Sequence, residues 1–343
     1  MASILREIAR RAGVSVATVT RVLAQEGDYR RPFYAERAER IRAIADDLNY
    51  RPNLAARAMK TGRFGSLALI GGRESGVGHL GPQVVDGVCI RAAQEGQLVY
   101  VARFSSVDLA DPRRLPPLLR RRAVDGILLV YTHRVPQSVD DLEASLGIPV
   151  VWLNHGRDRD TVRFADREAA ELAVQTLVSR GHRRILCYAP GHEDGDGDQH
   201  YAGDERIAGY RSAMAAAGLQ PIVRTTPPDR DADYHARVLH GDLAGRSHPT
   251  AVLCLGASDL VVYGAMRRGL RVPEDVSVCT FTRYRDKDHD LPVARLRTPD
   301  WDLGAEAVAM LLRRIDDPGR HEPALRLPVP LVDDRFLVAR EEA

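Results

Sequence analysis

The sequence predicts an N-terminal all-α helix-turn-helix domain, followed by an α/β core of two doubly wound parallel-sheet subdomains. Two patterns support this fold class. Apolar residues recur at helical spacing from Ile4 to Leu48, whereas beyond residue 64 short apolar runs rich in β-branched residues alternate with helical stretches. The chain has 343 residues, enough for two or three domains with a substantial buried core.

Three helices are predicted in the first 48 residues. The first spans about 4–12, the second begins after Ser15, and the third spans about 33–48. Gly13 permits a sharp turn after the first helix, and Ser15 is placed to cap the second. The residues expected to face inward are Leu5, Ile8, Ala9, Ala12, Val19, Val22, Leu23, Tyr34, Ala38, Ile41, Ala45 and Leu48. This arrangement is typical of a helix-turn-helix unit.

The second helix should expose Val16, Ala17, Thr20 and Arg21. Arg21 can read guanine through two hydrogen bonds, and Val16 and Ala17 can pack on thymine methyl groups; a phosphate contact is the alternative for Arg21. The first 63 residues contain thirteen Lys and Arg against seven Asp and Glu, and the remainder contains 36 against 40. This charge distribution indicates that the N-terminal segment meets a polyanion.

Residues 50–63 should connect the two domains. Pro52 ends the third helix, and residues 54–59 are helix-prone but too few to form a stable helix alone. Residues 61–65 are predicted to form a linker.

From residue 64 onward, strands and helices should alternate. Strands are predicted over 66–70, 98–104, 125–131, 148–153, 183–189, 222–226, 250–256 and 276–281. Helices are predicted over about 83–95, 112–123, 138–146, 168–180, 205–217, 232–244 and 259–268. Two successive arrays of this kind imply two helix-covered parallel sheets, with a ligand cleft where the carboxyl ends of their strands meet.

Several classes of protein and site are disfavoured. No apolar run reaches the ~18 residues of a membrane span, and arginines interrupt any signal-peptide core, so a cytoplasmic protein is expected. The four cysteines lack CxxC spacing and are expected in the reduced core. Neither an HExxH nor a GxSxG motif occurs. We therefore expect no catalytic residue, metal or cofactor.

Two further motifs occur in surroundings that do not support their usual binding functions. The GxGxxG pattern over 76–81 starts five residues beyond its strand, which favours a cleft loop over a dinucleotide site. Asp194, Asp196, Asp198 and Glu205 have the spacing of a calcium loop, but Gln199 stands where that loop needs glycine. A solvated acidic loop is therefore the simpler interpretation.

The run ILREIARRAGVSVATVTRVL over 4–23, followed by LNYRPNLAAR over 48–57, resembles the LacI/GalR family of bacterial transcriptional regulators. The resemblance continues through RAVDG (122–126), RGHRRI (180–185), ERIAGY (205–210), PTA (249–251), GLRVPEDVSV (269–278) and LG (303–304). It spans nearly the whole chain. It implies a periplasmic-binding-protein-like core, a homodimer or tetramer, a palindromic operator DNA and a small-molecule effector that controls repression.

The resemblance also assigns residues to both sites. DNA contacts fall on Ser15, Val16, Ala17, Thr18, Thr20 and Arg21, and on Asn53, Ala56 and Met59 of a hinge helix. This helix forms on the operator and inserts an apolar side chain into the minor groove, where Met59 replaces the usual leucine. Effector contacts fall on Asp166, Arg206, Ser258, Asp259 and Thr282. Ser258 stands where the family has Asn, and Thr282 where it commonly has Asp.

These residues suggest the chemistry of the effector. An arginine beside acids and small polar groups suits adjacent hydroxyls, so a sugar or a sugar derivative is expected. Thr282 and Arg283 remove an acid and add a positive charge, which adds weight to an acidic or phosphorylated sugar; the alternative is that Arg283 points to solvent. The alternatives are an exposed helix arginine for Arg206 and a helix N-cap for Asp259.

The expected domains are a helix-turn-helix domain (1–49), a hinge helix with its linker (50–63) and an effector-binding and dimerisation core (64–343). The first core subdomain takes about 64–163 and 294–323, and the second about 164–293 and 324–343. The rival functions are a sugar-binding transport protein and a βαβ enzyme. A transport protein would need a signal peptide, which we do not find in the sequence. An enzyme would need a nucleophile, a set of metal ligands or a phosphate-binding loop, and none is placed in the sequence.

Overall fold

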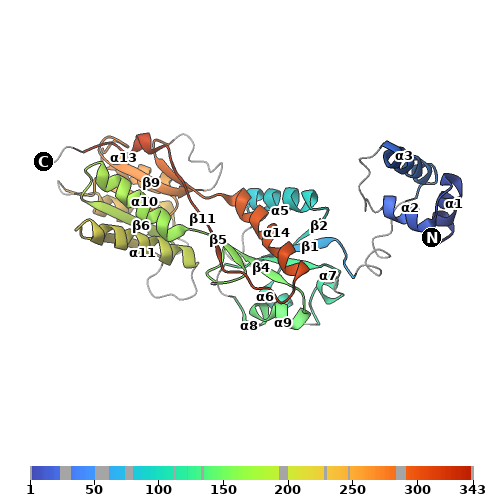
Figure 1. The fold of residues 1–343 in the computed structure, drawn as a ribbon. Helices are drawn as coiled ribbons and strands as arrows, with labels where there is room; N and C mark the ends of the chain where they lie inside the picture. Colours follow the sequence, from blue (N-terminus) through green and yellow to red (C-terminus); the bar gives the residue numbers. More distant parts are fainter. Residues whose placement is uncertain are drawn as a thin grey trace. The chain divides into compact units, whose positions relative to one another are not determined.

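The computed structural model divides the chain into two compact units, Met1–Gly65 and Ser66–Ala343, and each is described by itself (Figure 1). The structure describes residues 2–23, 32–50, 62–73, 80–111, 113–121, 123–132, 135–192, 200–227, 230–245, 248–282 and 291–340.

In its described residues, the first unit is a bundle of three helices. They are α1 (Ala2–Ala12), α2 (Val16–Leu23) and α3 (Pro32–Asp47). Their common core consists of Ile8, Ala9, Ala12, Val19, Val22, Ala38, Ile41 and Ala45, with Leu5, Val14, Leu23 and Leu48 packed against it. Gly13 has a φ of 66°, the left-handed conformation that the turn after α1 requires. The prediction that Tyr34 faces inward is wrong: it lies in the first turn of α3 and is 46% exposed.

The second unit contains two six-stranded sheets. Their strand orders are β11-β5-β4-β3-β1-β2 and β12-β10-β9-β8-β6-β7. The strands are β1 (Ser66–Gly72), β2 (Leu98–Phe104), β3 (Gly126–Val130), β4 (Val150–Leu153), β5 (Thr161–Phe164), β6 (Ile185–Pro190), β7 (Ile222–Thr226), β8 (Ala251–Cys254), β9 (Ser277–Thr282), β10 (Ala294–Arg297), β11 (Leu325–Leu327) and β12 (Leu331–Val332). All pairs are parallel except β10 with β12.

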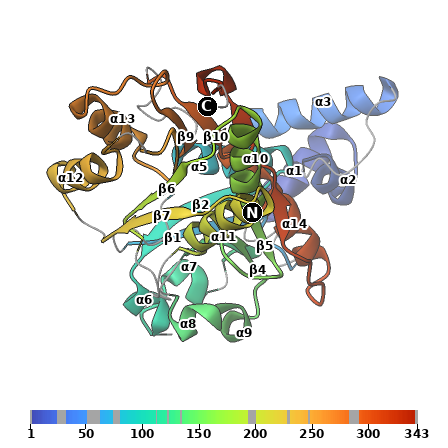
Figure 2. The same ribbon diagram turned by 90° about the vertical axis from the view of Figure 1, so that its left-hand side faces the viewer.

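Helices cover both faces of each sheet (Figure 2). They are α5 (Pro82–Gln94), α6 (Ser106–Ala110), α7 (Pro117–Arg120), α8 (Gln137–Asp140), α9 (Leu142–Leu146), α10 (Asp166–Ser179), α11 (Tyr201–Ala216), α12 (Ala232–Asp242), α13 (Ser258–Arg267) and α14 (Asp300–Asp316), followed by a 3₁₀ turn over Asp334–Phe336. Strand residues alternate between the faces: Leu67 and Leu69 join a core with α5 and α14, whereas Ala68 and Ile70 join a core with α6 to α9. The β1 run is therefore buried throughout.

Prolines shorten one predicted helix. Where a helix over 112–123 was expected, the described residues form only α7 (Pro117–Arg120), and α6 (Ser106–Ala110) lies before that range. Pro116 caps α7 and Pro117 is its first residue. An interior proline removes an amide donor and clashes with the preceding turn, so a continuous helix is excluded there.

The chain crosses between the sheets three times. It leaves the first sheet after β5, returns after β10 and leaves again after β11. Residues 294–297 thus belong to the second sheet and 325–327 to the first, so these two crossings lie a few residues after the expected ones. Three chain segments therefore connect the two sheets. Among the helices of the described residues, none is long and apolar enough to cross a membrane.

Candidate DNA-binding surface and ligand cleft

One face of α2 is free of the three-helix core. Val16 is 39% exposed and Ala17 and Arg21 are also exposed, whereas Val19 and Val22 are buried. The start of the helix is fixed by Ser15, whose Oγ accepts the Thr18 amide proton at 3.2 Å. This places a small apolar pair at the start of one exposed helix face and a long cation in its last turn.

Two of the predicted contact residues already bond within the helix. The Thr18 hydroxyl lies 2.9 Å from Ser15 Oγ, and the Thr20 hydroxyl donates to the Val16 carbonyl at 2.9 Å. Both threonines are half-buried. The three predicted hinge residues Asn53, Ala56 and Met59 lie outside the described residues.

Two arginines of α1 are held by acids. Glu7 accepts from Arg10 at 2.6 and 2.8 Å and from Arg11 at 2.9 Å, and Arg11 also pairs with Asp47 at 2.9 Å. The hydrogen bonds from Arg10 and Arg11 lower the pKa of Glu7 to about 2, so it is ionised at neutral pH. No ion pair of Arg21 occurs within the parts of the chain that the structure describes.

In the core, Asp166 and Arg206 meet at the crossover after the first sheet. Asp166 opens α10 and is 1% exposed, and Arg206 lies in the second turn of α11. The Arg206 Nε donates to Asp166 Oδ1 at 2.7 Å. Asp166 Oδ2 is buried without a hydrogen-bond partner in the described structure. A buried carboxylate oxygen of this kind is costly unless a ligand or water supplies a donor.

Arg206 also reaches the ends of two strands of the second sheet. One of its terminal nitrogens donates to the Leu255 carbonyl, just after β8, at 3.4 Å. Its guanidinium lies over the Phe281 ring, near the end of β9, 3.9 Å from the ring centroid. The arginine therefore connects α10, β8 and β9. Phe281 was not predicted as a site residue, because nothing in the sequence distinguishes it from a core strand residue.

The other predicted cleft residues differ in burial. Ser258, the first residue of α13, is fully buried, whereas its neighbour Asp259 is exposed. Asp259 is not the N-cap of this helix; Ala257 holds that position in a left-handed conformation. Thr282, the last residue of β9, is 6% exposed, and its carbonyl accepts the Thr298 amide and hydroxyl protons at 3.0 and 3.3 Å.

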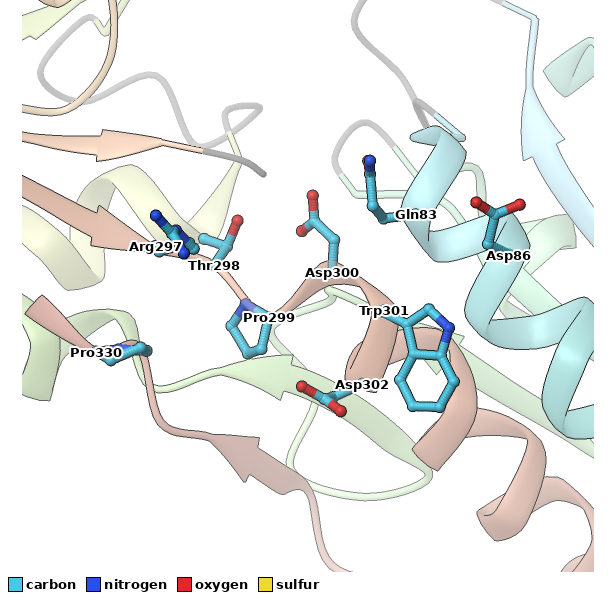
Figure 3. A pocket seen from close by; sticks show the side chains of 9 residues that line it. All are labelled: Gln83, Asp86, Arg297, Thr298, Pro299, Asp300, Trp301, Asp302 and Pro330. Atoms are coloured by element: carbon cyan, nitrogen blue, oxygen red, sulfur yellow. The ribbon is translucent and has the colours of Figure 1, made fainter. Parts of the chain in front are cut away.

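Thr298 lines a pocket at the junction of the subdomains (Figure 3). The pocket has a volume of about 590 Å³, within the usual range for small-molecule sites. Its lining consists of Gln83, Asp86, Arg297, Thr298, Pro299, Asp300, Trp301, Asp302 and Pro330. These residues come from the starts of α5 and α14 and from the β10 and β12 region, so the pocket is built from both subdomains.

A neutral histidine lies on the first-sheet side. Burial and the nearby Arg163 guanidinium lower the pKa of His155 from 6.5 to about 4. Its Nδ1 accepts the Arg157 amide proton at 3.2 Å. Within the described residues, His, Cys, Asp and Glu side chains form no group of three that could hold a metal ion.

Comparison with known proteins places the chain among bacterial regulators. Residues 4–53 match the family model "Bacterial regulatory proteins, lacI family", and residues 174–335 match the "Periplasmic binding protein-like domain". The chain belongs to the lacI family of bacterial regulatory proteins. The resemblance inferred from the helix-turn-helix and hinge motifs is thereby confirmed, and residues 4–53 form the DNA-binding domain of a lacI-family transcriptional regulator.

Relatives of this lacI-family protein cover nearly its whole length. The HTH-type transcriptional repressor PurR of Vibrio parahaemolyticus is 29% identical over 324 residues, 91% of this chain and 92% of the relative. The protein of the same name from Pectobacterium atrosepticum is 28% identical and covers 96% of both chains.

Solved structures confirm the fold class. A lac repressor dimer bound to operator and the anti-inducer ONPF has a TM-score of 0.69 at 24% identity, covering 97% of this chain and 98% of that one. A complex of the transcriptional regulator CelR with cellobiose has a TM-score of 0.62 at 24% identity, covering 96% and 98%. The predicted helical domain and two parallel-sheet subdomains are both present in this fold.

Proposed function

We propose that the protein is a transcriptional repressor that binds a palindromic operator as a homodimer, and that a small molecule bound between the core subdomains controls this binding. The buried, unpartnered Asp166 Oδ2 beside Arg206 carries the ligand part of the proposal. The exposed face of α2 carries the DNA part. The relatives named as repressors support the direction of regulation.

On the DNA, α2 would lie in the major groove. Val16, Ala17 and Arg21 would face base edges, while Ser15, Thr18 and Thr20 lie where the helix approaches the phosphate backbone. The hinge residues proposed to reach the minor groove are Asn53, Ala56 and Met59. The Thr20 hydroxyl already donates to the Val16 carbonyl and the Thr18 hydroxyl already bonds Ser15 Oγ, so they would contact phosphates as secondary partners.

The proposed effector is a polyhydroxylated molecule, a sugar or a sugar derivative. Arg206 offers guanidinium donors and Asp166 an unused acceptor, and a hydroxyl can satisfy both. Thr282 ends β9, and Ser258 and Asp259 begin α13, which follows β8; we place all three at the same cleft. Among similar solved structures, one regulator is described with cellobiose and another with bound ribose.

Two exposed apolar sets support self-association. The first set consists of side chains that are 46–51% exposed, namely Ile90 on α5 and Leu98, Tyr100 and Val101 on the edge strand β2. Tyr263 and Met266 on α13 form a second set, 48% and 66% exposed. An edge strand bearing large apolar side chains pairs readily with another chain unless it is covered. A second copy covering both sets would form a two-fold dimer that presents two α2 helices to symmetric half-sites.

A ligand screen followed by a variant tests the effector site. Thermal-shift measurements with sugars and nucleosides identify a ligand, and calorimetry then compares the parent with Arg206→Ala. The variant should bind operator DNA as the parent does but lose at least tenfold in ligand affinity, with no ligand effect on DNA binding. A variant that binds and responds to the ligand like the parent would place the effector site elsewhere.

A further inference from the structure

A contact between the two core subdomains lies outside the proposed Asp166 and Arg206 pair. The loop after β4 in the first subdomain contains Asn154, whose φ is 53°. Its amide lies between two residues at the start of α11 in the second subdomain. The Tyr201 hydroxyl is 2.9 Å from one end of this amide, and His200 Nε2 is 3.1 Å from the other.

The Tyr201 ring is enclosed by residues of the first subdomain. The Arg163 guanidinium on β5 lies 5.5 Å from the ring centroid. Gly156 is so close that a Cβ added there would lie 3.2 Å from Tyr201 Cβ and Cγ. Most real Cβ contacts are longer, so only glycine fits this loop comfortably against the ring. His200 stacks on the remaining side, 5.0 Å between ring centroids at an interplanar angle of 24°.

His200 couples this contact to the start of α11. Its Nδ1 accepts the Ala202 amide proton at 3.1 Å and so caps the helix. An imidazole that accepts at Nδ1 is neutral and carries its proton on Nε2, which faces the Asn154 amide nitrogen; since both groups are donors, this is a packing contact and not a hydrogen bond. The same side chain therefore orders the first turn of α11 and contacts the other subdomain. Arg206 follows one turn later on the same helix.

We propose that Asn154, His200 and Tyr201 form a latch that holds the two core subdomains together at α11. The latch consists of the hydrogen bond from the Tyr201 hydroxyl to the Asn154 amide oxygen, the contact of His200 with the same amide, and a ring held by Arg163 and Gly156. It joins the loop after β4 to the helix that carries Arg206, so movement of either subdomain must strain or break it. Tyr201 and Asn154 are therefore positioning residues for the arrangement of the core, whichever ligand the cleft binds.

Hydrogen exchange of the full-length protein, followed by mass spectrometry, tests the latch without any ligand. Tyr201→Phe removes one hydroxyl and keeps the ring. Exchange should accelerate at least threefold both in residues 201–207 and in residues 154–161 of the other subdomain. Tyr234→Phe on α12 is the matched control, and it should change neither segment.

If Tyr201 acted only within α11, Tyr201→Phe would give a different pattern of hydrogen exchange. Faster exchange in 201–207 with unchanged exchange in 154–161 would overturn the proposal, since the effect would then stay within one subdomain. Asn154→Gly accepts the positive φ and removes the amide from the other side. Its effect combined with Tyr201→Phe should not exceed that of the larger single change. Independent, additive effects would also contradict a shared latch.

Discussion

Ion pairs distinguish several arginines with a structural role from the two that we place in the proposed binding sites. Glu7 occupies Arg10 and Arg11 on α1, whereas Arg21 extends from the exposed face of α2. In the core, Arg314 is fully buried and bonded to Glu143 and Asp160. Arg206 differs from Arg314, because its acid partner keeps one oxygen unused. We place Arg21 and Arg206 in the proposed sites.

Arg21→Ala should weaken operator binding by about 1–3 kcal/mol and relax the base preference at one symmetric position, because a bidentate contact to guanine is lost. Fluorescence anisotropy with specific and random duplexes measures this. Arg10→Ala is the control, since Glu7 already holds that side chain. An equal loss on both duplexes would show that Arg21 contacts only phosphate.

His182 should make the core sensitive to acid. Burial, with Arg340 nearby, lowers the pKa of this residue from 6.5 to about 4. Between these values the unfolded chain binds a proton that the folded chain does not, so the stabilisation present above pH 6.5 is lost as the pH falls toward 4. The free energy of unfolding, measured in denaturant from pH 7 to 4, should fall less steeply in His182→Gln than in the parent. Parallel profiles would exclude this contribution.

At the scale of elements, glycines set how closely α5 and α14 pack. A Cβ on Gly304 would lie 2.4 Å from the Val84 carbonyl oxygen and 2.8 Å from the Val88 nitrogen. Backbone atoms cannot move aside as a side chain can, so the two helices would have to separate. On Gly241 in α12, an added Cβ meets nothing within 4 Å. The second unit thus contains one helical glycine at which an added Cβ would clash and one at which it would find free space.

Gly304→Ala should lower the free energy of unfolding by about 1–3 kcal/mol through overpacking. Gly241→Ala should raise it by about 0.5–1 kcal/mol, because alanine is the better helix former and has room. Denaturant unfolding of both variants checks the pair. A neutral Gly304→Ala would mean that the contact between α5 and α14 relaxes without cost.

Most helices and strands could be predicted from the sequence. Strands buried on both faces appear as continuous apolar runs, and helices show apolar residues at helical spacing. The prediction missed β5, α6, β10 to β12 and α14, and it merged α8 with α9. The pair of Asp166 and Arg206 could be inferred from family motifs. Phe281, Asn154 and Tyr201 could not, since their roles arise only when distant strands and helices meet.

At the scale of the whole molecule, the proposed dimer depends on exposed apolar side chains. Leu98→Asp, on the edge strand β2, should raise the dimer dissociation constant at least tenfold, because a charge would be buried without a partner. Analytical ultracentrifugation measures this. Leu172→Asp is the matched control, an exposed leucine on α10. Unchanged association of Leu98→Asp would remove β2 from the interface.

Selection of binding sites from a random duplex library by the full-length protein tests the central claim most directly. We expect enrichment of one two-fold symmetric sequence, with half-sites about one helical turn apart or a multiple of it, and an affinity that falls steeply with salt. Arg21→Ala should relax one position in each half-site. A library that stays unenriched at low salt, or a selected site without two-fold symmetry, would contradict a homodimeric DNA-binding regulator that reads its operator through α2.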